Sequence, residues 1–254
     1  MLQVVCIKQV ADTETRVKVA ADGRTLDPAQ VTWILNPYDE FALEQALRIR
    51  EAAGQGEVVV LTLGGPGVQT TLRNALAMGA DRAIHLKTDA TQPDSLQVAR
   101  ALADELTGLD AQLLWFGKQS VDDDAAQVAP MVAELLGHPC VTVVAAIELT
   151  QGPEGARAVV EREVEGGREV VEVTLPAVLA AEKGLNEPRY ASLKGIMSAK
   201  KKPIEEKPVT LAPPALEILS LSLPAPRAPG RIIGKGVEAV PELVRLLHEE
   251  AKVI

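Results

Sequence analysis

The first two-thirds of the chain alternates short apolar runs with segments of helical periodicity. The clearest run, EVVVLTLGG at 57–65, is almost continuously apolar, which predicts a strand buried on both faces. Strand and helix alternate often enough to predict an α/β fold, a mostly parallel sheet with helices on both faces. The predicted strands cover 4–10, 32–35, 57–65, 83–86, 113–117 and 140–149, and the predicted helices begin at 36–37 or cover 68–77, 95–106 and 124–137.

The start of the first predicted helix is marked by its residue types. Asn36 is a good cap, and Pro37 suits the first turn because a missing N–H costs nothing there. Asp39 and Glu40 add negative charge at the positive end of the helix dipole. A strand that ends at Leu35 is therefore expected to lead directly into a helix.

The pattern changes near residue 150. Residues 156–179 alternate apolar and charged side chains around Gly166-Gly167, which predicts a β-hairpin with one solvated face. Residues 185–202 follow neither periodicity, and the chain beyond Lys202 is rich in proline until a final amphipathic helix at 241–252. The proline-rich arm carries Leu216, Ile218, Leu219, Leu221 and Leu223. These side chains either cover a partner subunit or return to the core of their own domain.

Composition narrows the class of protein. A chain of 254 residues forms one large domain, or a domain with an appendage. Its net charge of −9 and its 2% aromatic content disfavour binding to nucleic acid. With two cysteines, no secretory signal and no long apolar run, it is predicted to be intracellular and not inserted in a membrane. The three histidines have no zinc-binding spacing.

Three loops follow predicted strands and are candidates for nucleotide binding, because the carboxyl ends of parallel strands form the ligand-binding edge of such a sheet. They are 36–39, GGPG at 64–67 and GKQSVDDD at 117–124. None matches a dinucleotide fingerprint or a phosphate-binding P-loop. Each has a plain structural alternative, a tight turn or a solvated helix start, so only the three together indicate a nucleotide site.

No side chain stands out as a nucleophile or general base. Cys6 and His85 lie within predicted strands, where a structural role is favoured. The basic run 200–202 is either a solvated loop or a docking patch for an acidic partner. The sequence therefore predicts a binding or carrier protein more readily than an enzyme.

Four segments resemble the β subunit of electron transfer flavoproteins. They are NPYD at 36–39, ALAMGADRAIHL at 75–86, GKQSVDDDAAQ at 117–127 and the long stretch 160–205. The resemblance covers about residues 1–205. It implies an adenine-nucleotide-binding-like α/β domain over 1–205, with the hairpin and a recognition loop, and an extended arm over 206–254 that packs on an α subunit.

The resemblance also implies a buried AMP in this subunit and a FAD shared with the α subunit. The family's AMP site falls on four places in this sequence. Two are the single residues Cys6 and Leu63, and two are loops. The loops are Asn36, Pro37, Tyr38 and Asp39, and Gly117, Lys118, Gln119, Ser120, Val121, Asp122, Asp123, Asp124, Ala125, Ala126, Gln127 and Val128. The loop DDDAAQVAP shares DDD with members that bind AMP and AQV with members that bind a second FAD and bifurcate electrons. AMP is favoured, and the bifurcating type is the alternative.

Partner docking is implied as well, with Leu193 as the anchoring side chain. The family's recognition loop falls on Glu187, Pro188, Arg189, Tyr190, Ala191, Ser192, Leu193, Lys194, Gly195, Ile196, Met197 and Ser198. The expected partners are an α subunit, acyl-CoA and related flavin dehydrogenases, and a membrane quinone oxidoreductase as acceptor. Such a carrier serves fatty acid β-oxidation in the cytoplasm, or in the mitochondrial matrix of a eukaryote.

Two other classes share the predicted fold. An adenine-nucleotide-binding sensor accounts for the loops and the acidity, although it has no need of the hairpin, the recognition loop or the arm. An ATP-using ligase would need a phosphate loop that neither glycine-rich turn supplies.

Overall fold

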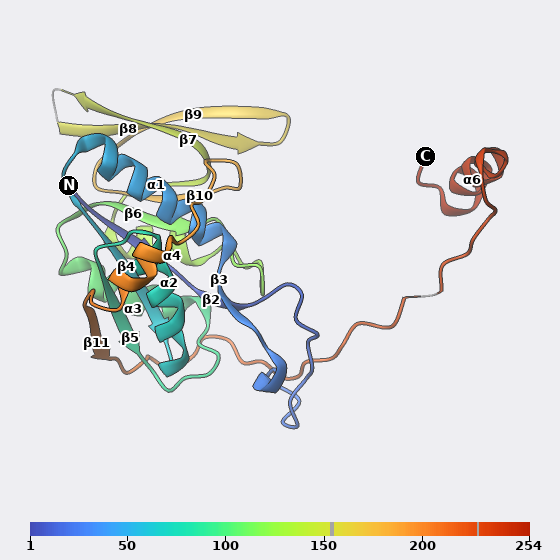
Figure 1. Ribbon diagram of the computed structural model, residues 1–254, viewed down its shortest axis with the longest axis horizontal. Helices are drawn as coiled ribbons and strands as arrows, with labels where there is room; N and C mark the ends of the chain where they lie inside the picture. Colours follow the sequence, from blue (N-terminus) through green and yellow to red (C-terminus); the bar gives the residue numbers. More distant parts are fainter. Residues whose placement is uncertain (153–154, 228) are drawn as a thin grey trace. The chain divides into compact units, whose positions relative to one another are not determined.

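The computed structural model describes residues 1–152, 155–227 and 229–254. In these residues the strands form a nine-stranded sheet in the order β11-β5-β4-β1-β6-β10-β7-β8-β9, with a separate two-stranded sheet of β2 and β3 (Figure 1). Their bounds are β1 Leu2–Cys6, β2 Gln9–Ala11, β3 Trp33–Leu35, β4 Glu57–Gly64, β5 Arg82–Lys87, β6 Ala111–Gly117, β7 Cys140–Gly152, β8 Gly155–Val164, β9 Gly167–Thr174, β10 Ala177–Ala181 and β11 Ile204–Pro208.

Six of the strands, together with the start of β7, run parallel. Residues 58–61 of β4 have no exposed surface, so the strand is buried on both faces as its apolar run predicts. The predicted α/β class with a mostly parallel sheet is confirmed. β8 pairs antiparallel with β7 and β9, and the predicted hairpin turns at Glu165 and Gly166.

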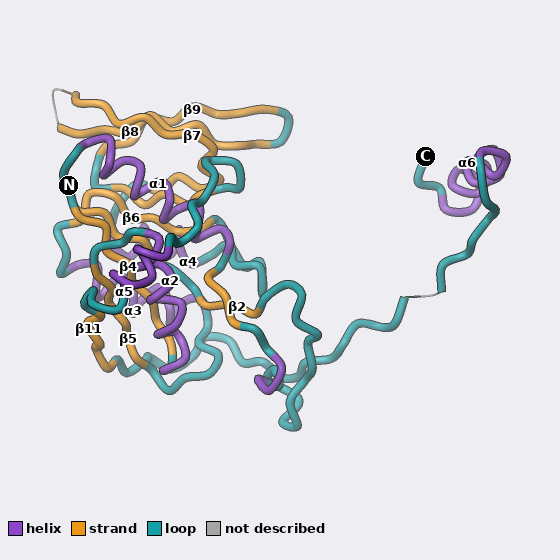
Figure 2. The backbone as a smooth tube through the Cα atoms, viewed as in Figure 1, coloured by secondary structure: helices purple, strands orange, loops and turns teal. Residues whose placement is uncertain are grey.

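Helices cover both faces of the sheet, and each face has its own apolar core. Leucines of α1 (Pro37–Ala53) and α2 (Gln69–Met78) pack in one core, together with Ala199 of α5 (Leu193–Ala199). The other core contains leucines of α3 (Ser95–Thr107) and small residues of α4 (Val128–Leu136). Figure 2 shows the helices around the central strands. Because crossovers between parallel strands are as a rule right-handed, helices fall on opposite faces where the chain reverses its direction across the sheet, as it does between β5 and β6.

Several elements differ from the sequence prediction. Residues 177–181, assigned to the hairpin pattern, form the parallel strand β10 between β6 and β7, where every residue is fully buried. The segment 32–35 pairs only with β2, outside the main sheet. The aperiodic stretch 185–202 contains the helix α5. The proline-rich stretch after Lys202 contains β11, which pairs with β5 at one edge of the sheet. Short elements of five to seven residues leave too little periodicity to detect.

The helix predicted over 124–137 begins later, at Val128. Asp124 and Ala126 have φ angles of 51° and 53°, in the left-handed region, so the backbone there cannot continue into a right-handed helix. The three aspartates therefore precede the helix, and the structural alternative given for this loop, a solvated helix start, does not describe them.

The chain divides into two compact units, residues 1–221 and 222–254. The first part of the proline-rich arm belongs to the first unit. There Asp94 accepts hydrogen bonds from the backbone N–H groups of Ala215 and Leu216, and Leu221 donates one to Gly23. Yet Leu216 and Leu219 are 71% and 73% exposed, so these side chains do not return to the core. The assignment of 206–254 to a partner subunit stays a prediction.

The second unit contains the predicted terminal helix. It comprises α6 (Val240–Leu246), which continues as a wider turn over Leu247–Ala251. Val240, Leu243 and Val244 on this helix are each more than 40% exposed. In the part of the chain that the structure describes, no helix has the length and apolar character that crossing a membrane requires.

Candidate functional site

The predicted nucleotide residues meet at one point of the sheet topology. β1 lies between β4 and β6, and the chain adds β4 and β5 on one side before it crosses to β6 on the other. The order of the strands thus reverses between β1 and β6, which is where open α/β sheets bind ligands. Cys6 ends β1, Leu63 lies at the end of β4, and Gly117 ends β6. We call the loops 36–39 and 117–124, together with Cys6, Lys8 and Leu63, the strand-end cluster.

Asp39 on α1 holds the strand-end cluster together. Its carboxylate is 5% exposed and accepts hydrogen bonds from the backbone N–H groups of Lys8 (2.7 Å) and Gly117 (3.0 Å). The side-chain amide of Asn36 donates a third, at 3.0 Å. Burial raises the pKa of Asp39 to about 7, even though these donors and the charge of Lys8 favour the ionised form. One side chain thereby links the first helix to the ends of β1 and β6.

Asn36 links the loop after β3 to the loop after β6. It occupies the cap position of α1, as predicted, but its side chain makes no capping hydrogen bond. Instead, its amide donates to the carbonyl of Gln119 (2.9 Å) and its oxygen accepts from the N–H of Val121 (3.2 Å). The structure therefore brings two of the three predicted loops, 36–39 and 117–124, into direct contact.

The close approach of these loops requires glycine at position 117. A Cβ added there would lie 2.6 Å from the Cβ of Tyr38 and 2.8 Å from its carbonyl carbon, and would also collide with Oδ1 of Asp39. No real side chain tolerates such contacts. The glycine thus serves the junction of β6 with α1 and need not touch a phosphate.

Lys8 balances the negative charge of the acidic loop that follows β6. Its ammonium group lies 2.8 Å from Asp122, 3.0 Å from Asp123 and 3.1 Å from the hydroxyl of Ser120. Hydrogen bonds and charge from the two aspartates raise the pKa of Lys8, against the effect of its burial. Sequence reasoning missed Lys8, although its place just after the first strand was a usable signal.

The N-terminus of α4 offers donors to an anion. Gln127 occupies its cap position, and among the described residues no side chain caps the helix. The first N–H groups of a helix lack partners within the helix, and its dipole favours negative charge. The predicted residues Ala125 to Val128 lead into this end. A phosphate group of AMP is therefore compatible with the residues present, with the aspartates directed to Lys8, Ser120 and Gln119.

Lys118 links the Tyr38 ring to the residue that follows β10. The ammonium group of Lys118 lies 5.5 Å from the centre of the Tyr38 ring and 2.5 Å from the carboxylate of Glu182, just after β10. The hydrogen bond and charge of Glu182 raise the pKa of Lys118. Burial raises the pKa of the Cys6 thiol well above its usual value, which disfavours the thiolate that a nucleophile needs.

The remaining sequence candidates have structural roles. His85 is fully buried in β5 and its Nε2 lies 2.9 Å from the carbonyl of Gly64. The glycine-rich turn 64–67 is tight, because a Cβ on Gly64 would lie 2.6 Å from a Val68 methyl group. Among the residues described, no group of three or more His, Cys, Asp or Glu side chains could hold a metal ion.

The predicted recognition loop has an exposed apolar surface on an anchored base. Tyr190, Leu193, Ile196 and Met197 are 98%, 76%, 46% and 65% exposed, and we call these four the apolar tip. The last three lie on α5, whose first turn is capped by the Ser192 hydroxyl. Large apolar side chains that stay in water beside a packed core usually mark a contact surface.

Comparison with known proteins gives matches over nearly the whole chain. Residues 24–212 match the electron transfer flavoprotein domain family. The chain is 39% identical over 260 residues to the electron transfer flavoprotein subunit beta of Bacillus subtilis, with 98% of each chain covered. The corresponding subunit of Bradyrhizobium diazoefficiens is 41% identical over 258 residues and both chains are fully covered. The human subunit is 39% identical over 254 residues, covering 98% of this chain and 97% of the human one.

Proposed function

Because this chain belongs to the electron transfer flavoprotein family and resembles its β subunits along its length, we propose that it is half of a heterodimeric electron carrier. It pairs with an α subunit, receives electrons from flavin dehydrogenases of the acyl-CoA type, and passes them to a membrane quinone oxidoreductase. The expected setting is fatty acid β-oxidation, in the cytoplasm or the mitochondrial matrix. The chain itself carries out no bond-breaking chemistry.

The strand-end cluster is the proposed AMP site of this subunit. The observation that carries this proposal is the meeting of 36–39 and 117–128 at the reversal point of the sheet, beside an α4 N-terminus with no side-chain cap among the described residues. Lys8 and Asn36 hold the loop 119–123 in place, and Cys6 and Leu63 offer apolar surface. AMP bound here has a structural role and helps to fix the loops.

The redox reaction belongs to FAD, which the proposed complex holds mainly on the α subunit. When bound, the flavin supplies the capacity to accept and release electrons. The side chains of the present subunit contribute the surface of the dimer and the docking of partners. The exposed leucines of the arm, Leu216, Leu219 and Leu223, are proposed to cover the α subunit.

The apolar tip is the proposed docking surface for dehydrogenases, with Leu193 as its anchor. An exposed leucine that enters a pocket on a partner can lose more than ~1 kcal/mol of binding free energy when truncated. Leu193→Ala should therefore slow electron transfer from an acyl-CoA dehydrogenase and leave the bound nucleotides unchanged. Normal transfer kinetics in this variant would contradict the docking assignment.

The nucleotide assignment is tested by purifying the chain with its α subunit, unfolding the complex and identifying the released small molecules by mass spectrometry. The expected result is one AMP and one FAD per heterodimer. Two FAD molecules and no AMP would replace the proposal with the bifurcating type. A chain that is monodisperse and binds an adenine nucleotide without any partner would favour the sensor.

A further inference from the structure

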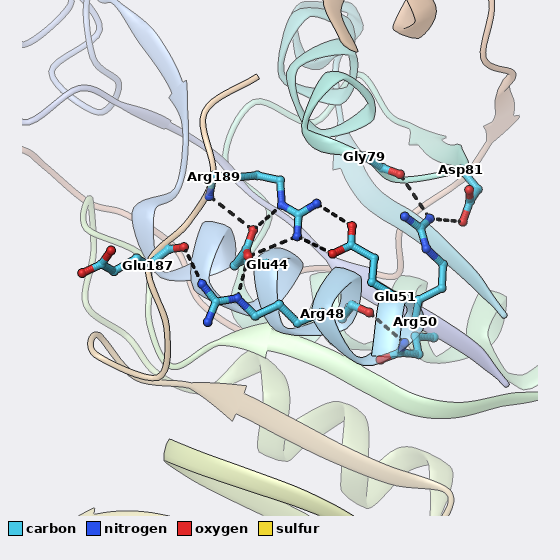
Figure 3. Close-up of polar contacts among 10 residues, drawn as sticks. Glu44, Arg48, Arg50, Glu51, Gly79, Asp81, Glu187 and Arg189 are labelled. Carbon is cyan, nitrogen blue, oxygen red and sulfur yellow. Dashed lines mark hydrogen bonds and ion pairs between the residues drawn. The ribbon is translucent and has the colours of Figure 1, made fainter. Parts of the chain in front are cut away.

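The base of the recognition loop is fastened to α1 by an ion cluster that includes a buried carboxylate. Glu44 of α1 is 3% exposed, and Arg189 of the loop donates to it from its backbone N–H and from Nε and Nη2 of its guanidinium. The Nε contact measures 2.7 Å. Arg189 also donates from Nη1 and Nη2 to Glu51, about two turns further along the helix. Figure 3 shows the guanidinium between the two carboxylates.

Two further side chains, Arg48 and Asn186, fix the residues around Arg189. Arg48 donates to Glu44 at 2.6 Å and to the carbonyl of Glu187 at 3.1 Å, so it links the same carboxylate to the loop backbone. Asn186 donates to the carbonyl of Phe41 at 2.9 Å. Since Arg189 is only one-third exposed and makes side-chain bonds to two carboxylates, the cluster differs from an isolated surface ion pair.

The other end of the loop is held separately, against α2. A Cβ on Gly195 would collide with the carbonyl oxygen of Ala77, so α5 packs directly on the backbone of the neighbouring helix. Arg73 of α2 donates to the carbonyls of Ala199 and Lys202. The apolar tip therefore lies between two anchors, one on α1 and one on α2.

Arg189 immediately precedes Tyr190, and Leu193 lies four residues after Arg189. The side chain of Arg189 points to α1, although the family resemblance counts it among the docking residues (Figure 3). We propose that Arg189 is a positioning residue, which uses Glu44 and Glu51 to fix the apolar tip in the arrangement that docks a dehydrogenase. This inference rests on the docking role proposed above. It predicts that Arg189 acts through Leu193, without a contact of its own to the partner.

The test uses the complete heterodimer, with AMP and FAD bound, and compares Arg189→Ala, Leu193→Ala and the double variant. An acyl-CoA dehydrogenase reduced by its substrate serves as electron donor. We expect Arg189→Ala to raise the KM for the carrier about fivefold to tenfold, with kcat little changed, because the defect lies in docking. The double variant should be no worse than Leu193→Ala by more than about twofold, because the two residues act as one unit.

A second measurement is independent of any donor. Hydrogen exchange of the backbone amides 190–198 should be faster in Arg189→Ala, and less so in Arg189→Lys, whose single ammonium group cannot bridge two carboxylates. Glu51→Gln provides a milder variant if Arg189→Ala does not fold. Arg50→Ala is the matched control. Arg50 lies on α1, like Glu44 and Glu51, but it binds Asp81 and the carbonyl of Gly79 instead of the recognition loop.

The outcomes separate the two proposals. Wild-type KM and exchange in Arg189→Ala, with a raised KM in Leu193→Ala, would overturn the positioning role and leave the docking surface intact. Effects that multiply in the double variant would also overturn it, because they would mean that Arg189 contacts the partner itself. A wild-type KM in Leu193→Ala would instead remove the docking surface, and the positioning role with it.

Discussion

Helix α1 carries two buried carboxylates that behave in opposite ways. Asp39 and Glu44 are 5% and 3% exposed, yet the pKa of Asp39 is raised to about 7 and that of Glu44 is lowered. Asp39 lies in the strand-end cluster, where its partners are mainly neutral N–H groups. Glu44 lies under the recognition loop, between the guanidinium groups of Arg48 and Arg189.

Burial alone therefore does not set the charge of a carboxyl group. Desolvation raises the pKa of both groups, and only full positive charges within hydrogen-bonding distance outweigh it at Glu44. The strand-end cluster thus contains a carboxyl group, that of Asp39, whose pKa of about 7 lets it lose its proton near neutral pH. The base of the loop is a cluster of ion pairs in which arginine charges favour the ionised carboxylates, which suits a surface that has to hold its shape.

The largest expected effect is at the junction of Asp39 with β6. Gly117→Ala forces a methyl group against Tyr38 and Asp39, and we expect a loss of about 3 kcal/mol in the free energy of unfolding. Denaturant unfolding measures it. Gly65→Ala is the matched control, because the nearest atom to its new Cβ is 3.8 Å away. Equal stability of the two variants would contradict the tight junction.

The pH dependence of stability should separate the two carboxylates. With a folded pKa of about 7, above the unfolded value, Asp39 keeps its proton only in the folded state over roughly pH 4–7. The contribution of Asp39 to the free energy of unfolding is fully present below the unfolded pKa. It is lost as the pH rises toward 7, at about 1.4 kcal/mol per pH unit. Asp39→Asn should remove this slope. An unchanged slope would mean that Asp39 is ionised throughout.

Glu44→Gln tests the opposite sign. Because the folded pKa of Glu44 is lowered, its contribution is present above the unfolded pKa and is lost as the pH falls through the acid range. We expect the variant to lose about 1–2 kcal/mol at pH 7 and to show a weaker acid dependence than the wild type. Because the Glu51 side chain is half-exposed, Glu51→Gln should lower the free energy of unfolding less than Glu44→Gln does. A larger loss in Glu51→Gln would contradict the role of Glu44 as the main carboxylate of the cluster.

The smallest effect on stability is expected at Lys8. Lys8→Met removes the charge that faces Asp122 and Asp123, but the Lys8 side chain is 44% exposed, so the loss in the free energy of unfolding should be only about 0.5–1 kcal/mol. Hydrogen exchange in 120–125 should nevertheless rise, because the aspartates then repel one another. Lys183→Met, at another exposed site, should leave that loop unchanged. Identical exchange in both variants would exclude Lys8 as the support of the loop.

Long elements and the family were predictable from the sequence. The buried strand at 57–64, the helices α1 and α3 and the hairpin around Gly166 follow from residue periodicity and turn chemistry, and the structure confirms them. The resemblance carried by 36–39, 75–86, 117–127 and 160–205 is confirmed by the match over 24–212. Which residues bind AMP or contact a partner stays a prediction.

Other features depended on contacts between distant parts of the chain. The place of β10 between β6 and β7 follows from pairing across more than sixty residues with 113–117, and no local pattern encodes it. The same holds for Lys8, whose partners Asp122 and Asp123 follow a different strand, and for Arg189, whose two carboxylates precede it by more than 130 residues.

The class of fold, its long elements and the family can be recognised without coordinates, because periodicity, turn residues and motifs are local properties of the chain. Which charges meet, and how the pKa of each buried carboxyl group shifts, depends on contacts that form only in the folded protein. The free energy of a buried charge depends on the atoms that surround it in space, and folding alone brings Asp39 to the ends of two strands and Glu44 to two arginines.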